Sequence, residues 1–139
     1  RHIVAPLVLG AGFSGARIDH ELGSMTVLVR HPDRRCILIG DDTIMLLCPP
    51  EITLDVAEGS AVSLFPMGDV GCDSEGLRWA TDGLRFAPDG RIGTLNKATG
   101  PIILRPDAPK MLLILPRAAL EVTIKALLAG GATWSVRAG

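Results

Sequence analysis

The stretch of residues 25–44, MTVLVRHPDRRCILIGDDTI, constrains the fold more than any other part of this chain. Its two apolar runs, residues 25–29 and 36–39, are short and rich in β-branched and aliphatic side chains, which favours buried strands over helices. Between them, Pro32 cannot donate a backbone hydrogen bond and Asp33 favours a turn. The sequence therefore predicts two strands joined by a charged connection.

This connection carries the candidate binding residues, which are Arg30, His31, Arg34 and Arg35. Arg30 is expected at a strand end, where it faces a loop. Charged side chains are mostly solvated, so the first interpretation is an exposed edge without a ligand. The second is that Arg30 grips an anionic group, because a guanidinium presents its N–H donors in a planar fork that matches such groups.

Length and composition set the outer limits. A chain of 139 residues suits one domain, and 47% hydrophobic residues with a net charge of −1 suggest neither a disordered tail nor a polyanion-binding surface. Nucleic acid is therefore not an expected partner. No apolar run approaches the roughly 20 residues that span a bilayer, so the fragment itself is expected to be soluble. Because it begins at Arg1, we expect any membrane segment or targeting signal to lie outside it.

The reactive residue types form no recognisable centre. Cys36, Cys48 and Cys72 are an odd set without C-x-x-C spacing or a neighbouring histidine cluster, which argues against a zinc site or a disulfide framework. We expect reduced, mostly buried thiols. No serine or cysteine has an evident base, and the three histidines are scattered. The sequence thus predicts no catalytic residues, no metal and no cofactor, and a protein that is not an enzyme.

Residues 10–15, GAGFSG, spell the G-x-G-x-x-G pattern of dinucleotide-binding units, in which glycines let a pyrophosphate approach a helix N-terminus. Residues 16–22 offer barely two helical turns before Gly23, whereas a crossover to a parallel strand needs a dozen or more residues. We therefore expect a hairpin in which residues 7–9 pair with residues 16–18 around a glycine turn. A fragment of a dinucleotide-binding enzyme is the less favoured alternative.

Later apolar runs recur at about ten-residue spacing with turn residues between them. Residues 43–47, 52–56 and 61–65 are expected strands, and the pattern is typical of a sandwich or barrel. The predicted fold class is therefore mainly β, an antiparallel β-sandwich with one C-terminal helix. Trp79, Phe65 and Phe86 are expected in its core, with an aromatic binding platform as the alternative.

The tail departs from this strand pattern. It predicts a strand at residues 110–115, a helix at 117–129 that ends before two glycines, and a last strand at 132–136. Leu120, Ile124, Leu127 and Leu128 share one face of the helix. We expect this face to pack on the sandwich, with burial on a partner as the alternative. We accordingly divide the chain into a sandwich of residues 1–106 and a strand-helix-strand extension of residues 107–139 that packs on it.

Two strings in the first half carry a family resemblance. Residues 29–33, VRHPD, match an I-G-R-x-P-D-like string, and residues 42–44, DTI, match the start of a D-x-x-[IV]-S-x-x-H string. Over roughly residues 5–80 the chain thereby resembles a forkhead-associated (FHA) domain. Met45 and Cys48 stand where that family has its phosphate-binding serine and supporting histidine. The resemblance implies a degraded phosphothreonine site in which Arg30 alone remains.

Degenerate FHA-like domains of this kind are similar to the cytoplasmic domain of the inner-membrane ring protein of bacterial type III secretion systems. That resemblance implies a non-catalytic scaffold for protein–protein interaction. Its partners would be ring or secretion-complex subunits, at the cytoplasmic face of the bacterial inner membrane.

A rival resemblance rests on residues 84–93, LRFAPDGRIG. This stretch looks like the F-x-P-D-G string of an H-type minor pseudopilin of type II secretion, a periplasmic β-rich protein. Those proteins begin with a long helix, which Pro6 and four glycines in residues 1–24 oppose. The pseudopilin is therefore the alternative.

Overall fold

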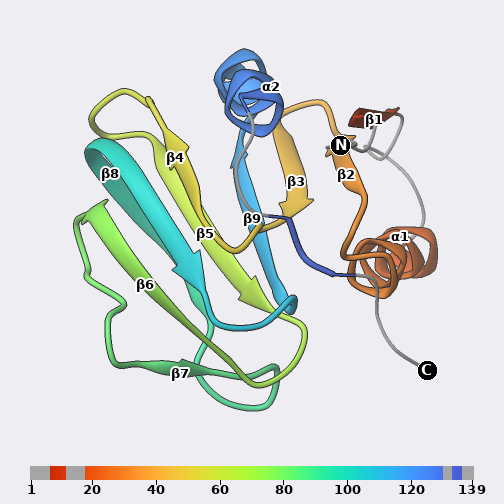
Figure 1. The fold of residues 1–139 in the computed structure, drawn as a ribbon, viewed down its shortest axis with the longest axis horizontal. Helices are drawn as coiled ribbons and strands as arrows, with labels where there is room; N and C mark the ends of the chain where they lie inside the picture. The colour runs from red at the N-terminus through yellow and green to blue at the C-terminus, as the bar shows by residue number, and fades with distance from the viewer. Residues whose placement is uncertain (1–6, 12–17, 130–132, 136–139) are drawn as a thin grey trace.

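The computed structural model describes residues 7–11, 18–129 and 133–135, which form a mainly β structure with two α-helices (Figure 1). The elements are β1 (Leu7–Ala11), α1 (Ile18–Arg30), β2 (Arg35–Ile39), β3 (Thr43–Leu47), β4 (Ile52–Leu54), β5 (Ala61–Pro66), β6 (Val70–Leu77), β7 (Arg85–Phe86), β8 (Gly93–Pro106), β9 (Met111–Pro116), the 3-10 turn η1 (Arg117–Ala119) and α2 (Leu120–Leu128). The predicted mainly β class and the C-terminal helix are confirmed.

One continuous sheet runs through the described residues in the order β1-β2-β3-β9-β5-β8-β6-β7, and β4 pairs separately with β8 (Figure 1). The 14-residue β8 pairs with β4, β5 and β6, so the sheet curls around it. Every pairing is antiparallel except β1 with β2, which runs parallel from Leu7 opposite Arg35 to Ala11 opposite Ile39. A parallel pair of this kind does not belong to the predicted antiparallel sandwich.

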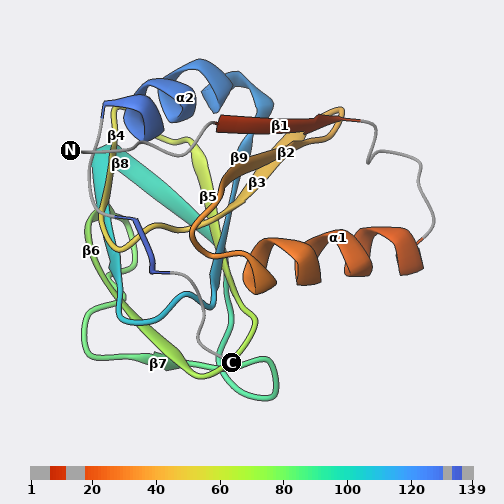
Figure 2. The same cartoon turned by 45° about the vertical axis from the view of Figure 1, so that its right-hand side comes forward.

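Two apolar clusters lie on opposite faces of the β2–β3–β9 region. Strand β2 alternates, with Ile37 and Ile39 in the cluster that reaches Leu127 of α2, and Leu38 in the cluster that holds Leu28 of α1. Figure 2 shows the two helices on either side of these strands. The larger cluster continues between the curled strands, where Phe86 is 2% exposed.

Helix α1 is the main departure from the sequence-based expectations. Residues 25–29, predicted as a strand, lie within α1, and the helix connects β1 to its parallel neighbour β2. The predicted hairpin of residues 7–9 is therefore wrong, because β1 pairs with β2 and Ile18 begins a helix; residues 16 and 17 lie outside the described part. This unit is a β-α-β crossover, the connection that the sequence had seemed too short to make.

The helix forms in spite of Gly23. A mid-helix glycine costs about 1 kcal/mol relative to alanine, but Leu28 and Val29 are 4% and 9% exposed, and burying such side chains contributes about 1.5–3 kcal/mol each. Asp19 and Glu21 in the first turn and Arg30 in the last also suit the helix dipole. Tertiary packing thus outweighs the local preference.

The remaining predicted strands agree with the structure. Strands at residues 36–39, 43–47, 61–65 and 110–115 are confirmed by β2, β3, β5 and β9, and β4 covers the first part of residues 52–56. The last strand, predicted at residues 132–136, is not confirmed, because the described residues 133–135 form no regular element. Strand β9 lies between β3 and β5 in the sheet, and the division at residue 106 stays a prediction.

Candidate functional site

Trp79 is 54% exposed and lies in the connection between β6 and β7. The prediction that it packs in the core is wrong, whereas Phe86 is in the core as predicted and Phe65 is half-buried against the cluster under α1. An aromatic side chain typically buries about 150–250 Å², which stabilises the fold. An exposed indole does not contribute that stabilisation. The alternative interpretation, an aromatic binding platform, therefore becomes the favoured one.

The backbone of Trp79 is held from β8 by the side chain of Asn96, which is 7% exposed. The Asn96 amide Nδ2 donates to the Trp79 carbonyl oxygen at 2.7 Å, and its Oδ1 accepts from the Trp79 N–H at 3.1 Å. Next to it, the Arg78 N–H donates to the Lys97 carbonyl at 2.8 Å. Asn96 thus replaces a strand partner just beyond the last paired residues of β6 and β8, and fixes the place of the indole.

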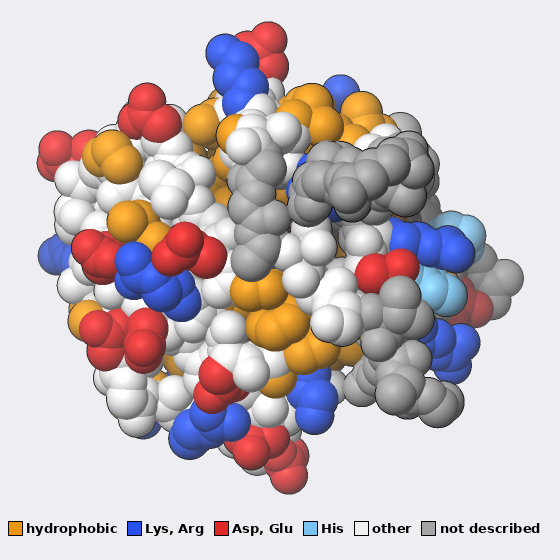
Figure 3. All heavy atoms as spheres, in the orientation of Figure 1, with side chains coloured by type: hydrophobic (Ala, Val, Ile, Leu, Met, Phe, Trp, Pro, Cys, Tyr) orange, Lys and Arg blue, Asp and Glu red, His pale blue; other side chains and the backbone are white. Residues whose placement is uncertain are grey.

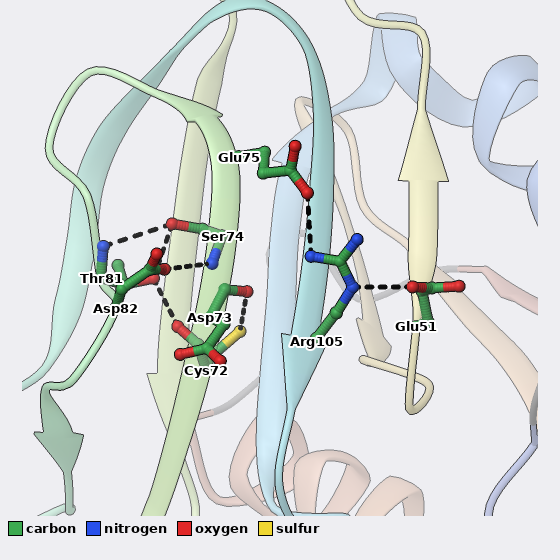
Figure 4. A network of polar contacts seen from close by, with 8 residues as sticks. All are labelled: Glu51, Cys72, Asp73, Ser74, Glu75, Thr81, Asp82 and Arg105. Atoms are coloured by element: carbon green, nitrogen blue, oxygen red, sulfur yellow. Dashed lines mark hydrogen bonds and ion pairs between the residues drawn. The ribbon is translucent and has the colours of Figure 1, made fainter.

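A second set of hydrogen bonds holds the far side of the same connection (Figure 4). The Thr81 hydroxyl donates to the Cys72 carbonyl at 2.5 Å, so the bond of 2.8 Å between the Thr81 and Ser74 hydroxyls is donated by Ser74. The Thr81 N–H donates to Ser74 Oγ at 3.2 Å, and Asp82 accepts from the Ser74 N–H at 2.6 Å. Residues 78–82 are therefore anchored at both ends.

A cavity of about 170 Å³ lies beside Trp79. Leu84, Phe86 and Ile92 supply apolar walls. Thr81, Thr94 and Asn96 add polar groups, and among the described residues that line the cavity Arg91 is the only charged one. Arg78 lies over the indole, with its guanidinium carbon 5.0 Å from the ring centroid, and it is not among the lining residues, so we infer that it covers the ring face turned away from the cavity. The arrangement is suited to holding a flat ring against the open indole face.

The other charged groups nearby are paired with one another. Arg105 binds Glu51 at 2.7 Å and Glu75 at 2.9 Å, while Arg85 binds Asp69 at 3.2 Å and also Asp107. Figure 3 shows acidic and basic side chains interspersed over the face that carries β4, β8 and β6. These exposed pairs suit a solvated surface.

The thiols do not provide a nucleophile. Burial raises the pKa of Cys72 to about 12, and burial followed by the nearby Cys72 raises the pKa of Cys48 well above its usual value. Thiolates are therefore scarce at neutral pH. The expectation of free, mostly buried cysteines is confirmed, and no group of three or more potential metal ligands occurs among the described residues.

The four binding residues predicted from the sequence do not form one exposed patch. Arg30 is the last residue of α1, not a strand end, and it is exposed together with His31 and Arg34. Arg35 instead turns inward and is 7% exposed, and its Nη1 has no hydrogen-bond partner among the residues that the structure describes. It lines a cavity of about 30 Å³ that shares no lining residue with the one beside Trp79. That these four residues bind a partner or an anion stays a prediction.

Sequence reasoning missed Asn96 and Arg91 and assigned Trp79 to the core. One available signal was that residues 78–83, RWATDG, show no alternating apolar pattern, so Trp79 had no regular strand to place it inside. The role of Asn96 had no local signal, because its partner is 17 residues away in the sequence.

No protein-family model matches this chain. It is similar to Thiamine pyrophosphokinase 1 of Arabidopsis thaliana, with 34% identity over 96 residues that cover 64% of this chain and 36% of the relative. Thiamine pyrophosphokinase 1 of Oryza sativa subsp. japonica is 38% identical over 97 residues, which cover 65% of this chain and 36% of that protein. The chain thus spans little more than a third of the length of these relatives.

Solved structures agree in fold. Thiamin pyrophosphokinase from Candida albicans superposes with a TM-score of 0.72 at 13% identity, over 82% of this chain and 45% of that one. Thiamine pyrophosphokinase from Bacillus subtilis gives a TM-score of 0.68 at 15% identity, over 81% of this chain and 56% of that one. The fold of this chain is therefore one that occurs in thiamine pyrophosphokinases.

These similarities overturn the resemblances drawn from short strings. The FHA-like secretion scaffold and the pseudopilin are both wrong, and so is the prediction of a non-enzyme, because the relatives and structural neighbours are kinases. The physical reason is visible in α1: residues 29–33, matched to a strand-end string, are the end of a helix and a turn. Nothing found supports ring subunits or an inner-membrane location, and neither α1 nor α2 has the length and apolar character to cross a bilayer.

Proposed function

We propose that this chain is part of a thiamine pyrophosphokinase, an enzyme that transfers a diphosphate group from ATP to thiamine, and that the cavity beside Trp79 binds one ring of thiamine. Five plant thiamine pyrophosphokinases, 31–38% identical over about two thirds of the chain, support the family. Because the chain spans less than two fifths of their length, we assign to it a share of substrate binding and not the whole reaction.

The main support for this binding site is that the indole of Trp79 is exposed while its backbone is held in place. Thiamine consists of an aminopyrimidine and a positively charged thiazolium, both flat and poor in electrons, and such rings stack on the electron-rich face of tryptophan. Trp79 offers one open face, since Arg78 lies over the other. The hydrogen bonds from Asn96 hold the platform in place before the ligand arrives, which lowers the entropy cost of binding.

The rest of the cavity fits the same ligand. Leu84, Phe86 and Ile92 give an apolar surface for the ring edge, and Thr81 and Thr94 are also among the lining residues. A volume of about 170 Å³ accommodates one heterocyclic ring with its substituents. The proposal needs neither a membrane nor a protein partner at this surface.

The test is a binding measurement on Trp79→Ala. Trp134→Phe serves as the background, because the chain has two tryptophans and this change leaves the fluorescence of Trp79 alone. We expect thiamine to quench that fluorescence saturably, and Trp79→Ala to weaken binding in calorimetry by about tenfold or more, since an aromatic stack and its buried area contribute on the order of 1.4 kcal/mol. Equal affinities in Trp79→Ala and the parent would exclude the platform.

A further inference from the structure

Arg91 differs from Arg85 and Arg105, its neighbours in this half of the molecule, because it has no carboxylate partner among the described residues. Arg85 and Arg105 each bind two acidic side chains. No ion pair joins Arg91 to any described residue, although Asp89 lies in the same turn. Arg91 instead is one of the residues that line the cavity beside Trp79.

The backbone that carries Arg91 is ordered by its own turn. The Ala87 N–H donates to the Arg91 carbonyl at 3.1 Å, and the Gly90 N–H donates to the Ala87 carbonyl at 3.0 Å. This turn joins β7 to β8, so it stands opposite the connection that carries Trp79. The P-D-G string of the sequence is thus a tight turn that supplies one wall of the cavity.

The charge of the cavity does not match the charge of thiamine. Thiamine is a cation, yet no acidic residue lines the cavity, and cations lie on two sides of the indole, Arg91 at the cavity wall and Arg78 over the opposite ring face. A phosphate ester of thiamine carries the anionic group that a guanidinium binds best, through paired N–H···O contacts. Arg91 therefore opposes the binding of thiamine and favours its phosphorylated forms.

We propose, on the basis of the function proposed above, that Arg91 makes this cavity selective for phosphorylated thiamine, so that the diphosphate product binds more tightly than thiamine itself. The Trp79 face holds the same ring of either compound. Arg91 contacts only the phosphate group. Thiamine diphosphate that binds this cavity more tightly than thiamine would compete with thiamine for it. The proposal therefore also predicts competitive inhibition of the enzyme by its product.

The experiment compares thiamine, thiamine phosphate, thiamine diphosphate and inorganic pyrophosphate by calorimetry in magnesium-free buffer, where the phosphates keep their charge. For the unmodified chain we expect thiamine diphosphate to bind about tenfold more tightly than thiamine, with a preference that shrinks as salt is raised. In Arg91→Met the ratio should fall to about one while the affinity for thiamine stays equal or rises. Arg91→Lys should keep part of the preference.

The matched control is Lys125→Met, which removes an exposed cation of α2 that does not line this cavity. It should leave all affinities unchanged, and unchanged melting temperatures would show that both variants are folded. If thiamine binds through Trp79 but the diphosphate preference is absent, or persists in Arg91→Met, this inference is overturned and the proposed function stands. If no thiamine compound binds at all, both fail together.

Discussion

Replacing Asn96 tests how the Trp79 platform is held. In Asn96→Ala three backbone groups lose their partner: the N–H and the carbonyl of Trp79 and the N–H of Lys97, which donates to Asn96 Oδ1 at 2.8 Å. A net hydrogen bond contributes about 1 kcal/mol, and water replaces part of the loss because Trp79 is exposed. The expected loss of stability is roughly 2–3 kcal/mol, which corresponds to a melting temperature lower by roughly 6–12 °C.

Asn96→Asp separates the donor from the acceptor role. The remaining Oδ1 can still accept from the Trp79 N–H, but the second oxygen would face the Trp79 carbonyl at the 2.7 Å now occupied by a hydrogen bond. A protonated carboxyl can donate there and a carboxylate cannot, so the pKa of this aspartate should be raised in the folded state. Stability should then be near that of the parent below about pH 4 and fall as pH rises through the raised pKa.

The assay is thermal unfolding of parent, Asn96→Ala and Asn96→Asp between pH 4 and pH 8, followed by thiamine binding at each pH. Binding to Asn96→Asp should weaken over the same range in which its relative stability falls. A flat difference between Asn96→Asp and the parent across this range would contradict an Asn96 amide whose Nδ2 faces the Trp79 carbonyl. A melting temperature of Asn96→Ala within about 2 °C of the parent would refute the clamp itself.

Two further predictions concern stability. Arg35→Met should leave the melting temperature unchanged or raise it, because it removes a buried guanidinium with an unpartnered Nη1. The control is Arg34→Met, which changes an exposed arginine. If Arg35→Met lowered the free energy of unfolding by more than about 2 kcal/mol, Arg35 would have a partner after all. Gly76→Ala should lower the melting temperature far more than Gly59→Ala. Both glycines have positive φ, +83° and +88°, but an added Cβ at Gly76 lies 2.2 Å from the Pro101 carbonyl oxygen, whereas Gly59 has open space; equal costs would show that the close approach does not matter.

The sequence was informative wherever a pattern was local. Short apolar runs and turn residues located β3, β5 and β9, because a strand and its flanking turns are specified within about ten residues. The same use of local patterns failed to predict helix α1. Met25, Leu28 and Val29 show the i, i+3, i+4 spacing of a helix, but the run is short and β-branched and Gly23 looked like its limit. The packing of that face on Leu38 and Leu112 decided the outcome, and this is not a local property.

The candidate site was largely invisible for a related reason. Its cavity joins residues from the connection after β6, the turn after β7 and the start of β8, which only the sheet order brings together. The resemblances rested on strings of about five residues, which recur by chance in turns of unrelated proteins. The arginines between α1 and β2 stood out in sequence because they are adjacent there, yet Arg35 points away from the others into the protein.

The strand pair that carries Trp79 departs from regular pairing in two places. The β6–β8 register shifts between Glu75 and Leu77, at Gly76, and Leu95 on β8 has φ of 67° and is 79% exposed. Bulges and left-handed non-glycine residues cost stability and are found preferentially where a side chain must be aimed. Here they flank Trp79 and Asn96 in the sheet. The irregularities of β6 and β8 therefore agree with the proposal that this edge of the sheet binds a ligand.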